Sequence, residues 1–161
     1  MVNVLGLTRV TNSAVEITNA MVVTGSAYAS GDSLGWPYEI PYAVGNQGGL
    51  LTQSTLYIQS ASGITPFIRV HFYGQSASGV TAGVAHAVDV DYHLGYVDHT
   101  AWVTGGGQLL ISQVDKPNLS LDNFTPTNAR SVWATLESFA TAWGFGATAN
   151  PMKHKIGVLQ D

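Results

Sequence analysis

The sequence predicts an all-β fold, a jelly-roll-like antiparallel β-sandwich. β-Branched and aromatic residues gather in short runs, and several of these runs alternate between apolar and polar side chains. Glycine-rich turn sequences separate the runs at roughly the 8–12-residue spacing that is typical of sandwiches. No window keeps helical periodicity over three turns. A chain of 161 residues fits one domain of ordinary size, so we expect residues 1–161 to form a single sandwich.

Seven runs are predicted to be strands. Each combines β-forming residues with flanking Gly, Pro, Ser or Asn, the residues that end strands in turns. In chain order they are Leu7–Thr18, Leu50–Ser60, Pro66–Tyr73, Gly95–Thr104, Gln108–Val114, Arg130–Phe139 and Lys153–Gln160.

Two of these runs alternate clearly enough to assign their faces. In Pro66–Tyr73, we expect Ile68, Val70 and Phe72 to face the core, because side chains alternate across a strand. The opposite face then carries Phe67, Arg69, His71 and Tyr73. In Arg130–Phe139, the inward set is Val132, Ala134 and Leu136, and the outward set is Trp133, Thr135 and Glu137.

Three segments are less regular. Residues Gly25–Gln47 form an irregular excursion, where a β scaffold often carries its function, and the possible interface residues there are Trp36, Tyr38 and Tyr42. Asn118–Thr125 lies between two prolines and is predicted to be a short edge strand or a connector. In Asp89–Leu94, an aspartate is expected to cap a single helical turn before the next strand.

The low charge narrows the classes of partner. Only 10% of the residues are charged, the net charge is −4, and there is no cysteine. A nucleic-acid partner is not expected, because phosphate recognition needs a basic surface. No apolar run approaches the ~18 residues of a membrane helix, so no membrane partner is expected either. The composition favours a protein that presents a folded, nearly neutral surface to another protein.

The main concentration of polar residues lies between His86 and His99 and is a candidate metal site. Imidazoles and carboxylates suit zinc or non-haem iron, and the segment also contains Asp89, Asp91, His93 and Asp98. No H-x-H or H-x-x-E-H pattern fixes their geometry, and a turn would scatter them. The sequence therefore favours a capped turn with solvated polar side chains, with neither a metal nor a cofactor.

Enzymatic activity is not expected. No serine lies in a G-x-S-x-G sequence, and Glu16, Glu39 and Glu137 are isolated along the chain, whereas a glycosidase needs two opposed carboxylates. The glycine runs at 48–49 and 105–107 lack the lysine of a phosphate-binding loop.

Four stretches together resemble small virion structural proteins of tailed bacteriophages. The stretch Ala27–Asp32, followed later by Gly49-Leu50-Leu51, resembles an AYxxGD segment with its GLL element. The others are Ile68–Tyr73, similar to an LxLxLF strand, Asp89–Val97, similar to DxDxxxLGxV, and Ile156–Asp161, similar to LxVLQD. The insertion at 36–47 departs from the pattern, so no site residue is carried over.

The resemblance implies a β-sandwich decoration or cement protein of the phage head. Such a protein is made in the host cytoplasm, binds the major capsid protein on the capsid exterior, stabilises the head and is often a homotrimer. One alternative is a receptor- or glycan-binding module of a tail or fibre that uses the aromatic residues of Trp36–Tyr42. Another is a metal-dependent hydrolase built on His86–His99.

Overall fold

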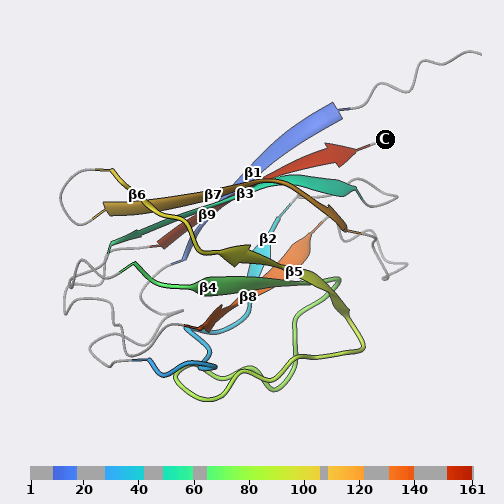
Figure 1. The fold of residues 1–161 in the computed structure, drawn as a ribbon. Coiled ribbons are helices and arrows are strands. Elements are labelled where there is room, and N and C mark those ends of the chain that lie inside the picture. The colour runs from blue at the N-terminus through green and yellow to red at the C-terminus, as the bar shows by residue number, and fades with distance from the viewer. Residues whose placement is uncertain are drawn as a thin grey trace, which may run out of the picture.

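The protein is a sandwich of two antiparallel sheets, seen nearly edge-on in Figure 1. The computed structural model describes residues 9–17, 28–41, 49–59, 65–105, 109–121, 131–139 and 152–160. These ranges contain strands and turns but no helix, and so no helix that could cross a membrane. The all-β prediction is confirmed.

The larger sheet has five strands in the order β1-β9-β3-β7-β6. Every pairing between neighbours in it is antiparallel. The strand bounds are Arg9–Ile17 for β1, Met152–Gln160 for β9, Leu50–Gln59 for β3, Leu109–Ser120 for β7 and Val103–Thr104 for β6.

The second sheet has four strands in the order β2-β8-β4-β5. Its pairings are antiparallel as well. The strand bounds are Tyr38–Ile40 for β2, Val132–Ser138 for β8, Ile68–Tyr73 for β4 and His93–His99 for β5.

The strand order is that of a jelly roll. The chain passes from one sheet to the other between β1 and β2, β2 and β3, β3 and β4, β5 and β6, β7 and β8, and β8 and β9. Only the β4–β5 and β6–β7 connections stay within one sheet. This arrangement of eight strands and the short β6 is the double-sheet, double Greek-key pattern that defines the fold, as the sequence predicted.

The core lies between the sheets and contains the residues that alternation assigned to it. Ile68, Val70 and Phe72 are fully buried in one cluster with Val132, Ala134 and Leu136. The outer face of the same strands is covered as well: Tyr73 and Trp133 pack against Ala77, Val80 and Tyr92 of the β4–β5 connection. Residues 74–92, the β4–β5 connection, therefore cover part of the outer face of the four-stranded sheet.

One predicted strand divides and another runs further than expected. Gly95–Thr104 becomes β5 and β6, because the chain crosses between the sheets at residues 100–102, where the Trp102 indole donates to the carbonyl of Pro66. β7 continues past Pro117, and the residues on both sides of that proline, Lys116 and Asn118, have positive φ. Asn118–Ser120 is thus the end of β7, and residues 122–125 lie outside the described ranges.

Two further expectations need correction in the irregular segments. β2, Tyr38–Ile40, lies within the excursion and was missed because three residues between prolines are too few to show alternation. Asp89–Leu94 is a hydrogen-bonded turn and not a helical one: the Tyr92 amide donates to the Asp89 carbonyl over 3.4 Å, and β5 begins at His93. The Asp89 carboxylate accepts from the amide and hydroxyl of Ser78, elsewhere in the same connection, and from the backbone amide of Asp91 in its own turn.

Candidate functional site

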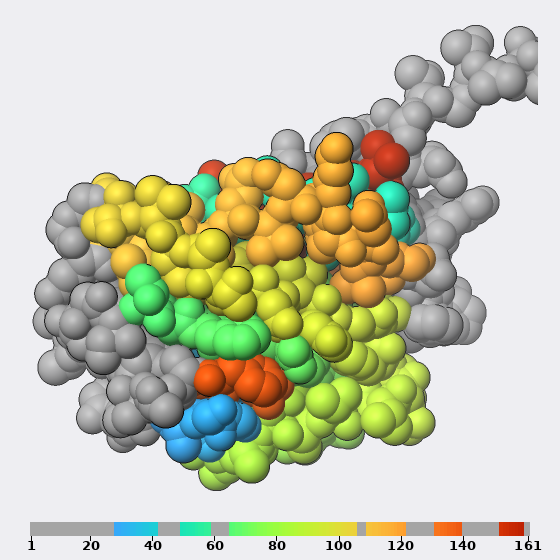
Figure 2. All heavy atoms as spheres, in the orientation of Figure 1, coloured from blue at the N-terminus to red at the C-terminus, as the bar shows by residue number. Residues whose placement is uncertain are grey.

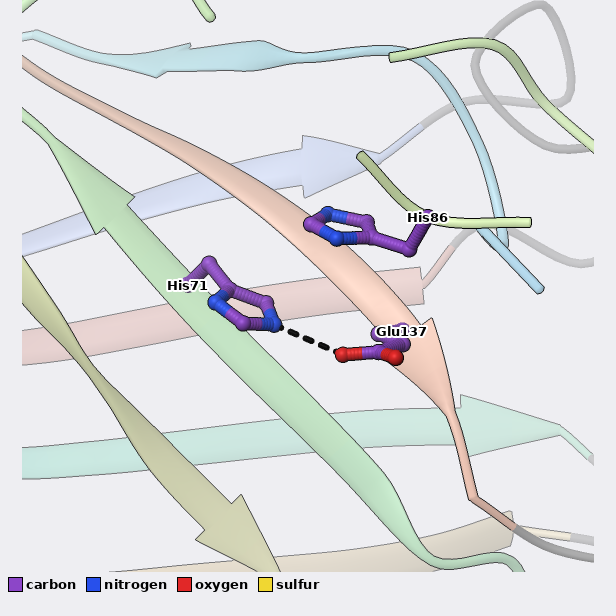
Figure 3. Close-up of side chains that lie close together, drawn as sticks. All are labelled: His71, His86 and Glu137. Carbon is purple, nitrogen blue, oxygen red and sulfur yellow. Dashed lines mark hydrogen bonds and ion pairs between the residues drawn. The ribbon is translucent and has the colours of Figure 1, made fainter. Parts of the chain in front are cut away.

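A cluster of three histidines and a glutamate lies between the outer face of the four-stranded sheet and residues 74–92. His71 comes from β4, Glu137 from β8 and His93 from the start of β5, while His86 belongs to the connection that covers them. In the antiparallel register of β4 and β8, His71 pairs with Thr135. The alternation that buries Phe72 therefore turns His71 and Glu137 to the opposite face, where their side chains meet (Figure 3).

The polar atoms of this cluster are close together. His71 Nε2 lies 2.8 Å from Glu137 Oε2, and His71 Nδ1 lies 3.1 Å from His93 Nε2. The His86 ring stacks on the His71 ring with centroids 4.5 Å apart and planes inclined by 13°. One nitrogen from each of His71 and His86 and one oxygen of Glu137 all lie within 4.8 Å of one another.

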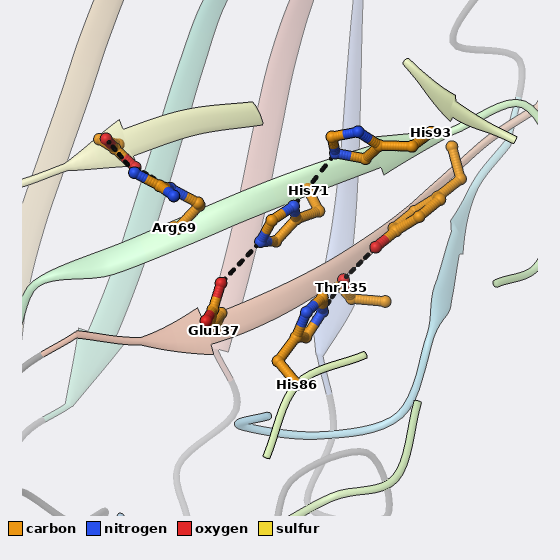
Figure 4. Close-up of polar contacts among 8 residues, drawn as sticks. Arg69, His71, His86, His93, Thr135 and Glu137 are labelled. Atoms are coloured by element: carbon orange, nitrogen blue, oxygen red, sulfur yellow. Dashed lines mark hydrogen bonds and ion pairs between the residues drawn. The ribbon is translucent and has the colours of Figure 1, made fainter. Parts of the chain in front are cut away.

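The neighbouring charge pair is held apart from the cluster (Figure 4). Arg69 donates two hydrogen bonds to Asp98, at 2.7 and 2.9 Å. Its guanidinium also lies over the Tyr96 ring, 3.9 Å from the centroid. Because the planar fork of an arginine pairs with one carboxylate in this geometry, Asp98 and not Glu137 is the principal partner of Arg69.

Burial keeps the histidines of the cluster neutral at pH 7. Desolvation, followed by the charge of His93, lowers the pKa of His71 to about 4. Desolvation and the nearby His71 lower the pKa of His86 to about 4. Desolvation raises the pKa of Glu137, against the opposing effect of His86 and Arg69. Since burial disfavours the charged form of the ring, the His71–Glu137 contact at neutral pH involves a neutral imidazole and not an imidazolium ion.

A hydrogen-bonded row links His93, His71 and Glu137. His71 lies between His93 Nε2 and the Glu137 carboxylate, and the Gly95 carbonyl is a further acceptor for the His93 ring. Each neutral imidazole carries a single N–H. When His93 donates to Gly95 and His71 donates to His93, the contact between His71 Nε2 and Glu137 brings two lone pairs together. A proton or a metal cation at that contact would complete the row.

His86 adds a second unsatisfied lone pair. Thr135 Oγ1 lies 2.8 Å from His86 Nε2 and 3.5 Å from the Tyr73 hydroxyl oxygen, so it can accept from His86 while its own proton points toward Tyr73. The proton of the neutral His86 ring is then on Nε2, and Nδ1 is left as a lone pair. His86 Nδ1 is buried and has no hydrogen-bond partner among the described residues. Buried polar atoms without a partner are uncommon in native proteins and call for an explanation.

The expected interface residues fall into different environments. Trp36 is 47% exposed. Tyr38 is only 2% exposed, and its hydroxyl bonds to His154 Nδ1 at 2.8 Å within the core, so in this structure it does not face a partner. Tyr42 lies outside the described residues.

The structure scatters most of the His86–His99 segment, as the turn hypothesis expected. Asp89 binds Ser78, Asp98 binds Arg69 and His99 is buried in the core. Its two remaining histidines nevertheless meet residues from elsewhere: His86 lies beside His71 and Glu137, and His93 bonds to His71.

The sequence reasoning missed His71 and Glu137 as members of a site. The signal was present, because alternation had already placed both residues on the outward face of their strands. The sequence does not show that β4 pairs with β8. This pairing brings Arg69 opposite Glu137 and His71 opposite Thr135. Glu137, isolated along the sequence, thus acquires an imidazole partner in the fold.

A second histidine group crosses the interior of the sandwich. Tyr38 Oη bonds to His154 Nδ1 at 2.8 Å, and Ser54 Oγ lies 3.0 Å from both His154 Nε2 and His99 Nε2. His99 Nδ1 lies 3.0 Å from Ser112 Oγ. Desolvation lowers the pKa of His154 to about 3 and that of His99 to about 4, so both rings are neutral. Every contact in this row can receive a proton, because the hydroxyls supply their own.

Comparison with known proteins gives no family. No family model matches the chain, and no curated protein matches it. Among solved structures, a chain from the Israel acute Paralysis Virus pentamer matches over 95% of this chain and 87% of its own length, with 11% identity and a TM-score of 0.25. A chain from a second structure of the virus matches over 95% and 72%, with 12% identity and a TM-score of 0.25. Superpositions this loose carry no conclusion about fold or function.

Proposed function

We propose that the chain is a structural protein of a virus particle, a decoration or cement protein that binds the outside of a tailed-phage head. The observation that carries the proposal is a group of exposed apolar side chains on two neighbouring segments of a jelly roll in which only 10% of the residues are charged. The serial resemblance to small phage virion proteins, from Ala27 to the end of the chain, supports the same function. Jelly rolls also serve as capsid and lectin domains, so the fold is compatible with the proposal without selecting it.

The apolar area comes from two neighbouring segments, residues 28–41 and 74–92, which lie against each other at the lower edge of Figure 2. Asp32 and Ala85 form a β-bridge, and the Ser33 amide donates to the Val84 carbonyl at 2.8 Å. The exposed apolar side chains on these segments are Trp36 at 47%, Val84 at 50%, Val88 at 40% and Val90 at 80%.

This surface suits contact with a protein shell. Aromatic residues are enriched and charged residues depleted at the centre of protein interfaces, and contacts of this kind depend little on salt. A homotrimer would repeat the surface three times around one axis, so three weak contacts would combine through effective concentration into firm attachment. The proposed partners are therefore the major capsid protein and two further copies of this chain.

The test is capture of the purified chain by heads that lack it, from the virus that encodes it. We expect saturable binding that changes little between low and high salt, and weaker binding by at least ten-fold for Val90→Asp. Val103→Asp is the matched control, because Val103 is 71% exposed but lies on β6, in the other sheet. Equal binding by both variants would contradict the proposed surface. Retention on host polysaccharide without binding to heads would support the tail or fibre module instead.

A further inference from the structure

We propose that His71, His86 and Glu137 bind a divalent transition-metal ion of the zinc type, and that this ion fastens residues 74–92 to the four-stranded sheet. The site differs from the sequence expectation of no metal. It does not depend on the proposed function, because it rests on the histidine cluster alone.

The donor set matches the chemistry of such ions. Two imidazole nitrogens and one carboxylate oxygen are a common set for zinc and for non-haem iron, and they leave a coordination position for water. The three ligand atoms already lie within 4.8 Å of one another. His71 and Glu137 come from neighbouring central strands of the sheet, so their spacing is set by the β4–β8 register.

The cation would satisfy the atoms that the protein leaves unsatisfied. When His71 donates to His93 and His93 donates to the Gly95 carbonyl, an ion between His71 Nε2 and Glu137 Oε2 would take the two lone pairs that meet there. His71 then carries its proton on Nδ1 and donates to His93. The same ion would take the buried lone pair of His86 Nδ1, which has no partner among the described residues.

Binding requires a small, definable rearrangement. Zinc–ligand bonds of about 2.0–2.2 Å place tetrahedral ligand atoms roughly 3.3 Å apart, whereas His71 Nε2 and Glu137 Oε2 are 2.8 Å apart. These atoms must separate slightly. The stacked His71 and His86 rings, inclined by 13°, must also tilt toward each other so that both lone pairs meet at the ion. His86 lies on a connection and not on a strand, and so is the ligand best placed to move.

Neighbouring residues hold the ligands in the required protonation state. In metal sites, a ligating histidine usually donates its other N–H to a fixed acceptor, and loss of that acceptor weakens binding by about 10–100-fold. His93 is this acceptor for His71, and Thr135 is the acceptor for His86. His93 and Thr135 are thus positioning residues, and Figure 4 shows both directed at the rings they support.

The first experiment titrates tag-free protein with Zn²⁺ by calorimetry and follows its melting temperature. We expect one ion per chain and a higher melting temperature at saturation, because a ligand that binds only the folded state stabilises it. Glu137→Gln keeps the size of the side chain and removes its charge, so it should weaken zinc binding at least ten-fold. Glu39→Gln makes the same change at an exposed site on β2 of the same sheet and should bind like the wild type.

A second variant guards against a folding defect in the first. His86→Gln alters the covering connection and leaves both strands intact, and it should also weaken zinc binding at least ten-fold while the zinc-free melting temperature stays within a few degrees of wild type. Equal zinc affinity in wild type, Glu137→Gln and His86→Gln would overturn the site. So would the lack of any saturable binding up to 100-fold molar excess of Zn²⁺ over wild-type protein.

Discussion

The two histidine groups of this protein differ both in burial and in hydrogen-bond partners: the inner rings are fully buried, whereas His86 and His93 of the outer group are partly exposed. Inside the sandwich, the row from Tyr38 to Ser112 contains three hydroxyls, each of which can donate a proton. On the outer face, the row from His93 to Glu137 contains no hydroxyl and ends in a carboxyl group, so the His71–Glu137 contact is left open when His71 donates to His93. The inner row is complete as it stands. The outer row has room for a cation.

This difference teaches that buried histidines are better classified by their partners than by their burial. Desolvation lowers the pKa to about 4 both in inner His99 and in outer His71. A low pKa therefore does not distinguish a structural histidine from a ligand. The partners of each ring do distinguish the two groups, because hydroxyls bring their own protons and a carboxylate does not.

Acid should produce the largest effect. The inner rings titrate near pH 3 and pH 4 in the folded state, against about 6.5 in the unfolded chain. Between these pH values the unfolded state binds more protons than the folded state. The contribution of the inner histidines to stability is therefore fully present above pH 6.5 and is lost as the pH falls toward 4. Each inner histidine should cost about 3 kcal/mol at pH 4, or roughly 6 kcal/mol for the pair.

Urea unfolding at pH 7, 6, 5 and 4 measures this loss. The double variant His71→Gln/His86→Gln separates the two groups, because it removes the outer rings whose pKa values are also near 4 and leaves the inner ones. It should keep about half of the pH dependence. A stability that does not change from pH 7 to pH 5 would contradict neutral buried histidines.

The next largest effect is the difference in stability loss between substitutions on the two faces of β4. Phe72→Ala removes a fully buried ring from the core and should lower the free energy of unfolding by about 3–5 kcal/mol. Arg69→Ala, on the outer face, loses a partly exposed ion pair with Asp98 and a contact with the Tyr96 ring, and should cost about 1 kcal/mol. Denaturant unfolding compares the two, and equal losses would mean that the faces are reversed.

Removal of one hydroxyl tests the inner row directly. Ser54→Ala leaves the Nε2 atoms of both His99 and His154 without their partner and should cost about 3 kcal/mol. Thr135→Val is the counterpart in the outer group, where it deprives His86 of its partner and Tyr73 of a long 3.5 Å contact, and should cost about 1–2 kcal/mol. A Ser54→Ala protein as stable as wild type would show that the inner row is not needed as a complete unit.

The smallest effect on stability is expected at Trp36. Trp36→Ser changes a half-exposed side chain outside both histidine groups, so the free energy of unfolding should stay within about 0.5 kcal/mol of wild type. Attachment to heads should weaken, since the substitution removes the largest apolar side chain of the proposed surface. Unchanged attachment together with a large loss of stability would make Trp36 a folding residue.

The fold was largely predictable because its strands are long enough to show alternation. Ile68, Val70 and Phe72 face the core as alternation required, and β1, β3, β8 and β9 match the predicted runs to within a few residues. Short elements were not predicted because they contain too few residues to show alternation. The three residues of β2 and the corner at residues 100–102, which separates β5 from β6, are determined by tertiary crossing and not by local pattern.

The candidate site could be predicted only in pieces. His86 and His93 stood out as polar residues near each other in sequence, but their partners His71 and Glu137 come from strands 15 or more positions away. Which strands pair is a long-range property, and the order β2-β8-β4-β5 could not be read from the sequence alone. Tyr38 shows the opposite error: an aromatic in an irregular segment suggested an interface, whereas its hydroxyl is used inside the core.

The end of β7 has a consequence for how copies of the protein coexist in solution. β6 pairs only with Leu110 and Ile111, so among the described residues nothing pairs with that edge of β7 over residues 113–120. An open strand edge is a template for sheet extension and aggregation. Here Pro117 lacks an N–H, Lys116 and Asn118 turn the backbone with φ of 53° and 52°, and the lysine adds charge. This kinked edge resists pairing with the strand of a second copy. Copies of the chain would therefore associate through surfaces other than this sheet edge.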